Sequence, residues 1–138
     1  ASRTRRLCAA PSYLARAGAP QAIADLSRHA CVLGAVDTWP LREHGPDGER
    51  EIAFKPQGRW RCNSGQSVLD AALQGLGICQ LPNFYVDAPI ADGRLVPLLE
   101  ANRPADEGVW AVYPHLRHLP AKVRLLVEHL EAHLNLAA

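Results

Sequence analysis

The sequence has 138 residues, the length of one ordinary domain. Apolar residues make up 48% and charged residues 21%, so the chain has enough apolar side chains for a globular core. A net charge of +1 excludes a strongly basic nucleic-acid-binding protein, and no run of about 18 apolar residues could span a membrane. The sequence contains no methionine, even at its start, which is typical of a fragment or a processed product.

Four cysteines are spaced too widely for a zinc ribbon or a redox C-x-x-C pair. Each lies in an apolar run of strand length, so we expect buried free thiols in a reducing compartment. The N-terminus lacks the apolar stretch of a secretion signal, and both observations predict a cytoplasmic protein. The four are Cys8, Cys31, Cys62 and Cys79.

The first quarter of the chain alternates strand-like and helix-like segments. Residues 5–11 predict a strand, and residues 11–18 predict a short helix that stops at Gly18. Residues 20–29 predict a second helical turn. The apolar run at 30–36 is typical of a strand that is covered on both faces.

The middle of the chain predicts a half-exposed antiparallel meander. Apolar and polar residues alternate at 51–55 and again at 59–62, and residues 44–49 have the glycine, proline and aspartate of a turn. A helix follows, with Asn63 or Ser64 as its cap and with glycines at its end.

Strands and helices continue to alternate toward the C-terminus. Residues 78–82 predict a buried strand, and the helix after it should be broken or kinked by Pro89. Residues 94–99 predict a strand, residues 101–108 a loop, and residues 109–114 another strand.

From Pro120 onward, apolar residues recur at i, i+4, i+7 and i+11, which predicts an amphipathic helix of about four turns. The alternation of strand and helix along the whole chain predicts an α/β sheet with right-handed crossovers. The apolar positions of the last helix are Val123, Val127, Leu130 and Leu134.

The sequence contains no catalytic or phosphate-binding motif: G-x-S-x-G, the Walker loop and G-x-G-x-x-G are all absent. His129 and His133 are four residues apart, but no third ligand accompanies them, so we predict no metal site. No nucleophile, base or carboxylate pair can be named, and we therefore predict neither an enzyme nor a cofactor. The one basic run, "RTRRL", is interpreted as a solvated terminus.

The candidate binding site is the turn "NSGQ", residues 63–66, where a strand ends and a helix begins. Ligands of open α/β sheets bind at the carboxyl ends of strands, and a helix N-terminus offers unpaired N–H groups. A second strand end, at residues 32–37, could face this turn. The alternative is structural: Asn63 or Ser64 caps the helix, and Gly65 relieves crowding.

Four segments, in this order, resemble the C-terminal part of the effector-binding domain of LysR-type transcriptional regulators. They are "RRLCAAPSYLARAGAPQAIADLSRHACVL", "GRWRCNSGQSVLDAALQGLGICQLPNFYV", "ADGRLVPLL" and "VWAVYPHLRHLPAKVRLLVEHL". The resemblance covers nearly the whole chain. It implies a periplasmic-binding-protein-like fold of type II, with a mixed sheet flanked by helices and a ligand cleft between two α/β subdomains.

The resemblance also implies how the chain is divided. Residues 1–112 would form the second subdomain with its crossover strands, and residues 113–138 the return segment and C-terminal helix of the first. The rest of the first subdomain and the N-terminal winged helix-turn-helix would be absent. DNA would therefore be bound only through that absent domain, and the last helix would expose an apolar stripe.

Carried over residue by residue, "CNSG" matches the turn that lines the family's cleft, and the end of "VLGAVD" matches the segment that faces it. Asp37 is a poor partner for an anionic effector unless it points away. The candidate effector-binding residues are Val36, Asp37, Asn63, Ser64, Gly65 and Gln66.

The resemblance implies a ligand-sensing and oligomerisation domain that binds a small-molecule effector, assembles as a homodimer or homotetramer, contacts no membrane and catalyses no reaction. The helix at 66–76 is one candidate for the assembly surface. One alternative is a solute-binding protein of a transport system, which would need a signal peptide and an oxidising compartment. Another is an enzyme built on the same fold, which would need an acid or base in the cleft.

Overall fold

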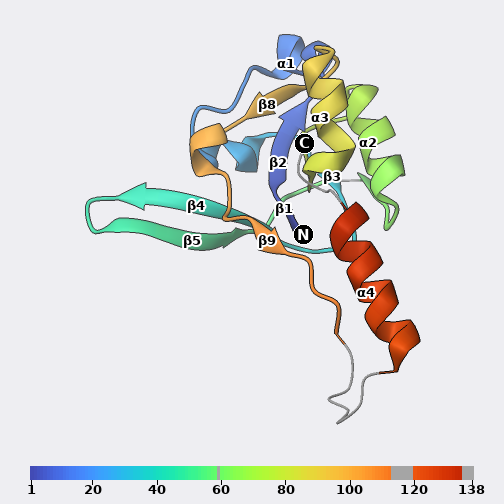
Figure 1. Ribbon diagram of the computed structural model, residues 1–138. Helices are drawn as coiled ribbons and strands as arrows, with labels where there is room; N and C mark the ends of the chain where they lie inside the picture. Colours follow the sequence, from blue (N-terminus) through green and yellow to red (C-terminus); the bar gives the residue numbers. More distant parts are fainter. Residues whose placement is uncertain (59, 113–119, 135–138) are drawn as a thin grey trace.

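A computed structural model of the protein describes residues 1–58, 60–112 and 120–134. At its centre is a three-stranded antiparallel sheet, whose middle strand is the first strand predicted from the sequence (Figure 1). Two later segments, both also predicted as strands, pair along its two edges. In sheet order the strands are β7 (Cys79–Pro82), β2 (Arg5–Ala9) and β8 (Val96–Leu98).

A parallel pair lies beyond β7. β3 (Val32–Leu33) pairs in parallel with β6 (Trp60–Arg61), and a parallel bridge between Cys31 and Ile78 connects β3 to the start of β7. The carboxyl ends of β3, β6 and β7 therefore lie at one edge. The predicted antiparallel meander is wrong for β6, because alternation indicates a half-buried strand without specifying which strand lies beside it.

Four short helices occupy the predicted positions. The first begins at Pro11 and stops before Gly18, and the third begins after Ser64 and stops before Gly75. Both glycines have a φ of 76°, which side chains other than glycine rarely adopt. The helices are α1 (Pro11–Ala17), the 3₁₀ helix η1 (Ile23–Arg28), α2 (Gly65–Leu73) and α3 (Asn83–Ala91).

Pro89 lies inside α3 and does not break it, so of the predicted break or kink the break is wrong. A proline disrupts a helix through the hydrogen bond it cannot donate and through its clash with the preceding turn. Pro89 is in the last turn, and the N–H of Asp92 still donates to the carbonyl of Ala88 at 3.0 Å. The helix therefore continues to Ala91, and Gly93, with a φ of 73°, follows its end.

Both faces of β2 are buried, which explains why its sequence is apolar at successive positions. Leu7 and Ala9 belong to one buried cluster, which contains side chains of α1 and η1. Cys8 belongs to the opposite cluster, which contains side chains of α2 and α3. The sheet is thus covered by helices on both sides, as the predicted α/β class requires.

The predicted hairpin extends from this body as a long arm (Figure 1). It consists of β4 (Trp39–Gly45) and β5 (Gly48–Phe54), which pair antiparallel along their whole length. A short 3₁₀ helix, η2 (Glu100–Asn102), fastens the arm, because Asn102 Nδ2 donates to the carbonyl oxygen of Arg42 at 2.9 Å. This helix lies in a segment that we predict as a loop.

Two short strands, β1 (Ser2–Arg3) and β9 (Glu107–Gly108), pair antiparallel beside the body. β9 also lies in the predicted loop, and the strand predicted at 109–114 is wrong for residues 109–112, which form no strand. In the described part of the chain no strand runs beside residues 110–112, so no ladder can satisfy their backbone groups. Residues 113–114 lie outside the described residues.

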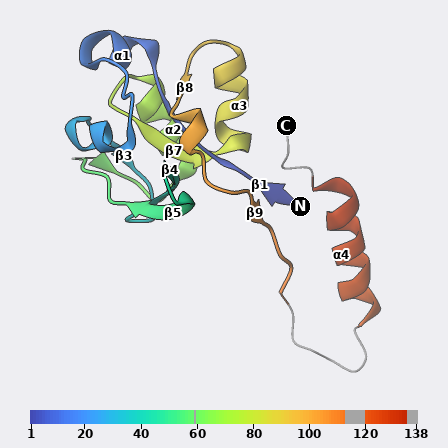
Figure 2. The ribbon, with the colours of Figure 1, turned by 90° about the vertical axis from the view of Figure 1, so that its left-hand side faces the viewer.

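The predicted last helix is α4 (Ala121–His133), and it stands apart from the body in both views (Figures 1 and 2). None of its described residues is buried. Of the predicted apolar stripe, Leu130 and Leu134 are exposed and Val123 and Val127 are partly exposed, so the rest of the described chain does not bury the stripe, as predicted.

Candidate functional site

A hollow of about 290 Å³ lies where the carboxyl ends of β3, β6 and β7 meet. Its volume is close to the lower limit for sites that bind small organic molecules. The residues that line it come from these strand ends, from the starts of α2 and α3, and from the first strands of the chain. They include Arg3, Arg5, Val36, Trp39, Asn63, Gly65, Gln80, Phe84 and Tyr85.

Three of the predicted site residues line this hollow, namely Val36, Asn63 and Gly65. Residues 32–37 and the turn at 63–66, which we predict to face each other, therefore meet at this hollow. Gly65 also has a packing role, because a Cβ added there would lie 2.6 Å from the ring of Tyr85. A glycine at the start of α2 thus allows Tyr85 of α3 to form part of the same wall.

The other three predicted residues make local contacts and are not among the lining residues. Ser64 is the cap of α2, since its Oγ accepts from the N–H of Ser67 at 3.3 Å. Gln66 Nε2 donates to Asp70 Oδ1 at 2.9 Å, one turn further along the helix. Asp37 forms an ion pair with Arg61 at 2.6 Å. Their roles toward an effector stay predictions.

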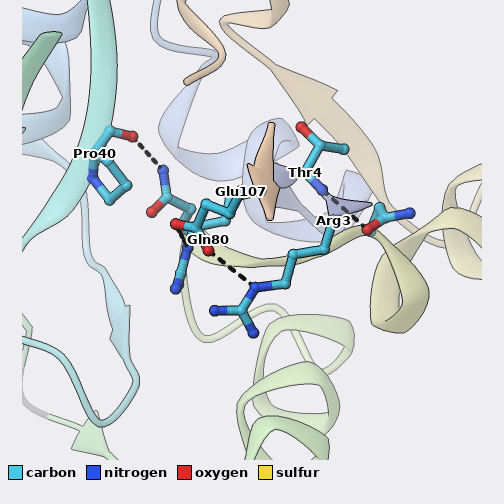
Figure 3. Close-up of polar contacts among 7 residues, drawn as sticks. Arg3, Thr4, Pro40, Gln80 and Glu107 are labelled. Atoms are coloured by element: carbon cyan, nitrogen blue, oxygen red, sulfur yellow. Dashed lines mark hydrogen bonds and ion pairs between the residues drawn. The ribbon is translucent and has the colours of Figure 1, made fainter. Parts of the chain in front are cut away.

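The residues that sequence reasoning missed are Arg3, Arg5 and Glu107. The Nε atoms of Arg3 and Arg5 each donate to one carboxylate oxygen of Glu107 at 2.9 Å, and Figure 3 shows the Arg3 contact. Arg5 is buried to about four-fifths, with 17% of its side chain exposed, so "RTRRL" is not a solvated terminus. The spacing of Arg3 and Arg5 was a usable signal, because residues two apart in an extended chain point to the same face.

Two further contacts join the pieces that surround the hollow (Figure 3). Gln80 of β7 donates from Nε2 to the carbonyl oxygen of Pro40 in β4 at 2.9 Å. The backbone N–H of Thr4 donates to Asn83 Oδ1 at 3.2 Å, and the N–H of Asn83 donates to the carbonyl of Thr4. The start of the chain, α3 and the hairpin are thereby held in one arrangement.

Because of its ion pairs, the contribution of Glu107 to the stability of the fold depends on pH. The hydrogen bond from Arg5 lowers the pKa of Glu107 most, and the contacts with Arg3 lower it further, while burial opposes them. A carboxylate whose pKa is lower in the folded state stabilises the fold fully above its ordinary pKa. This contribution is lost as the pH falls through the lowered value.

We therefore expect Glu107→Gln to lower the free energy of unfolding at neutral pH by no more than about 1 kcal/mol, because a carboxylate that is one-third exposed is screened by solvent. The difference from the unaltered protein should shrink as the pH is lowered through the acidic range. Urea unfolding at a series of pH values measures it. A difference that stays constant down to the lowest pH would contradict the assignment.

Cys62 is the one cysteine at the hollow, where it is half-buried, whereas the other three thiols are buried. Burial raises the pKa of Cys31 to about 11. A hydrogen bond with Cys8, whose Sγ lies 3.6 Å from that of Cys79, and burial raise the pKa of Cys79. Buried thiols with raised pKa values react slowly, because the thiolate is the reactive form.

We expect a thiol reagent to label Cys62 first in the folded protein and to reach the other three only after unfolding. Mass spectrometry of briefly labelled protein measures this order. The variant Cys62→Ser should remove the fast phase of labelling, and a fast phase that persists in this variant would show that another thiol is exposed.

A larger hollow of about 540 Å³ lies near the amino ends of β3 and β6. No charged side chain is among its lining residues in the described part of the chain. Gln57 is the one polar side chain among its described lining residues, whereas Arg3, Arg5, Asn63 and Gln80 line the smaller hollow, which is therefore the better candidate. Among the described residues, no group of three or more side chains could hold a metal ion. None of the described helices has the length and apolar character needed to cross a bilayer.

The sequence of this chain is similar to a known protein family. The sequence matches the LysR substrate binding domain over residues 1–135. The chain belongs to this family. Its fold is accordingly the type II periplasmic-binding-protein-like fold, and both the resemblance and the fold class expected from the sequence are confirmed.

The chain is also similar in sequence to individual transcriptional regulators. The chain is 35% identical to the HTH-type transcriptional activator TtdR of Escherichia coli over 93% of its length, and 36% identical to the regulator PtxR of Pseudomonas aeruginosa over 92%. It spans 41% of the length of each of these proteins. These relatives regulate transcription, which decides against a solute-binding protein of a transport system.

Solved structures show the same relationship. The full-length virulence activator AphB of Vibrio cholerae superimposes with a TM-score of 0.80 at 25% identity, covering 96% of this chain and 46% of that one. The regulatory domain of CrgA from Neisseria meningitidis superimposes with a TM-score of 0.71 at 29% identity, covering 98% of this chain and 66% of that one. The chain therefore corresponds to part of a regulatory domain.

Proposed function

We propose that this chain senses a small-molecule effector within a bacterial LysR-type transcriptional regulator, and that the effector binds in the hollow at the ends of β3, β6 and β7. The observation that carries this proposal is the meeting of Val36, Asn63 and Gly65 at the carboxyl ends of parallel strands, in a domain of this family. Ligands of open α/β sheets bind at such strand ends.

The remaining parts of the proposal concern the whole protein. DNA would be bound by a winged helix-turn-helix that precedes this chain, and the protein would work in the cytoplasm as a homodimer or homotetramer. Residues 1–112 would form the second subdomain, and residues 113–138 would belong to the first. The exposed stripe of α4 supports this division, because such a surface is normally covered by another part of the protein.

The effector would act by shifting a conformational equilibrium, without a chemical reaction. If it binds one arrangement of the two subdomains more tightly than another, its binding favours that arrangement and changes the affinity for DNA.

Thermal-shift screening of the full-length gene product against metabolites tests this function. An effector at about 100 times its dissociation constant should stabilise the protein by about 2.7 kcal/mol. The variant Gly34→Leu should abolish the shift, because Gly34 lines the hollow, and a Cβ added there meets no atom within 4 Å, which leaves room for a leucine to occupy the ligand's space. Ser64→Ala and Gln66→Ala test whether these two predicted residues also contribute.

The sequence upstream of this chain is a second test. A winged helix-turn-helix of roughly 60 residues would support the regulator. A signal peptide in that position would contradict it. An effector whose binding is unaffected by Gly34→Leu, Ser64→Ala and Gln66→Ala would remove the site from this end of the sheet.

A further inference from the structure

One wall of the hollow carries hydrogen-bond donors that the protein uses only in part. Arg3 and Arg5 both line the hollow, and each guanidinium has five N–H groups. Among the described residues, each side chain donates one hydrogen bond, from Nε to Glu107. The terminal N–H groups of two neighbouring guanidiniums are therefore left to bind a further acceptor.

The charge at this wall is unbalanced. Arg3 and Arg5 carry two positive charges, and Glu107 supplies one negative charge, which leaves one positive charge in excess. No acidic side chain is among the described lining residues. Asp37, the nearby acid that seemed unsuited to an anionic effector, is paired with Arg61. The start of α2, as the positive end of a helix dipole, adds to the positive potential.

Apolar side chains also line the hollow. Val36 and Phe84 are about half exposed although they are large and apolar, and the rings of Phe84 and Tyr85 lie 4.7 Å apart. A ligand that covered these side chains would remove apolar surface from water. The hollow therefore offers both guanidinium donors and apolar or aromatic surface.

We infer that the effector is a small organic acid with one carboxylate, held by the free N–H groups of Arg3 and Arg5, and with an apolar or aromatic body against Val36 and Phe84. This inference rests on the proposed function, because it names the chemical class of ligand for the same hollow. Guanidinium groups bind carboxylates through strong, charge-assisted hydrogen bonds.

A monocarboxylate fits this wall better than a phosphate ester. Its single charge equals the excess positive charge, whereas a phosphate ester carries up to two negative charges beside Glu107. Glu107 acts as a positioning residue, since its two oxygens hold the two Nε atoms and leave the other N–H groups free. Because Arg3 lies in β1 and is paired across strands with Glu107 of β9, the bound acid would also be linked to this strand pair.

The test uses the full-length gene product in a chloride buffer that contains no other carboxylate or phosphate. Aromatic and aliphatic monocarboxylates are each compared with the corresponding neutral amide, beginning with benzoate and benzamide, and with phosphate monoesters of similar size. We expect acids and not amides to raise the melting temperature. Titration calorimetry of the best acid should show a dissociation constant about 10- to 100-fold higher in Arg5→Gln and in Arg3→Gln.

The controls separate recognition from folding. Arg94→Gln removes an exposed arginine that is paired with Asp92 and is not among the residues that line this hollow, so it should leave the affinity unchanged. Arg5→Lys keeps the charge but not the planar fork, and it should bind more weakly than arginine and more tightly than glutamine. Circular dichroism of each variant confirms that the fold is retained.

The outcomes distinguish this inference from the proposed function. If an amide binds as tightly as its acid, if only a phosphate ester binds, or if the acid is insensitive to both arginine variants, the inference is wrong. The proposed function still stands in these cases when Gly34→Leu abolishes binding. If no compound in a general metabolite screen binds in a way that depends on Gly34, both are wrong.

Discussion

Replacement of Trp39 by alanine is expected to lower the free energy of unfolding by about 3–5 kcal/mol, the range for large aromatic side chains removed from a core. Trp39 is the first residue of β4 and is 2% exposed. Its ring packs 6.3 Å from that of Phe54 and belongs to the buried cluster that contains Leu7 of β2. The substitution would leave a cavity at the base of the hairpin arm and beside the hollow. Urea unfolding followed by circular dichroism measures the change.

Phe84→Ala is the matched control for this prediction. It also removes an aromatic ring at the hollow, but this ring is 47% exposed. Less apolar surface is returned to water, so we expect a loss of about 1 kcal/mol or less. Equal losses for the two variants would show that Trp39 is not a core residue.

Replacement of Gly77 by alanine is expected to cost about 2–3 kcal/mol, through overpacking against backbone. A Cβ at this position would lie 2.3 Å from the carbonyl oxygen of Ala30. That oxygen cannot move away freely, because it accepts from the N–H of Ile78 at 2.9 Å, and the N–H of Ala30 donates to the hydroxyl of Tyr13. The clash would disturb the parallel bridge between β3 and β7, which places the strand ends at the hollow.

Gly34→Ala tests the same type of substitution without a clash. No atom lies within 4 Å of a Cβ added at Gly34, and its φ is not in the left-handed region. We expect a change between zero and a stabilisation of about 1 kcal/mol, because alanine reduces the entropy of the unfolded chain. A loss at Gly34 as large as that at Gly77 would mean that close packing is not the cause. Thermal unfolding of both variants provides the comparison.

Part of the candidate site could be predicted from the sequence because it depends on local patterns. A strand followed by a capped helix places Asn63 and Gly65 at a strand end, whatever the rest of the chain does. The capping residue itself was left open between Asn63 and Ser64, and the structure shows Ser64. The family resemblance added Val36, which the parallel pairing of β3 and β6 brings to the same hollow.

Two of the errors share one cause, which is that local patterns do not specify which strands pair. β6 alternates like a strand of a meander, yet it pairs with β3. Residues 109–112 are apolar like a strand, yet no described strand lies beside residues 110–112. Pro89 is tolerated because it is in the last turn of α3, a position that depends on where the helix ends.

The sequence by itself determined the positions of the helices α1 to α4, most of the apolar strands and the amphipathic character of the last helix, because these follow from periodicity and from the conformations that glycine and proline favour. Only the tertiary structure decided the charged wall of the hollow. Glu107 is 104 positions from Arg3 in the sequence, and the two meet because β1 and β9 pair antiparallel. Such a contact depends on long-range strand pairing, which no local pattern contains.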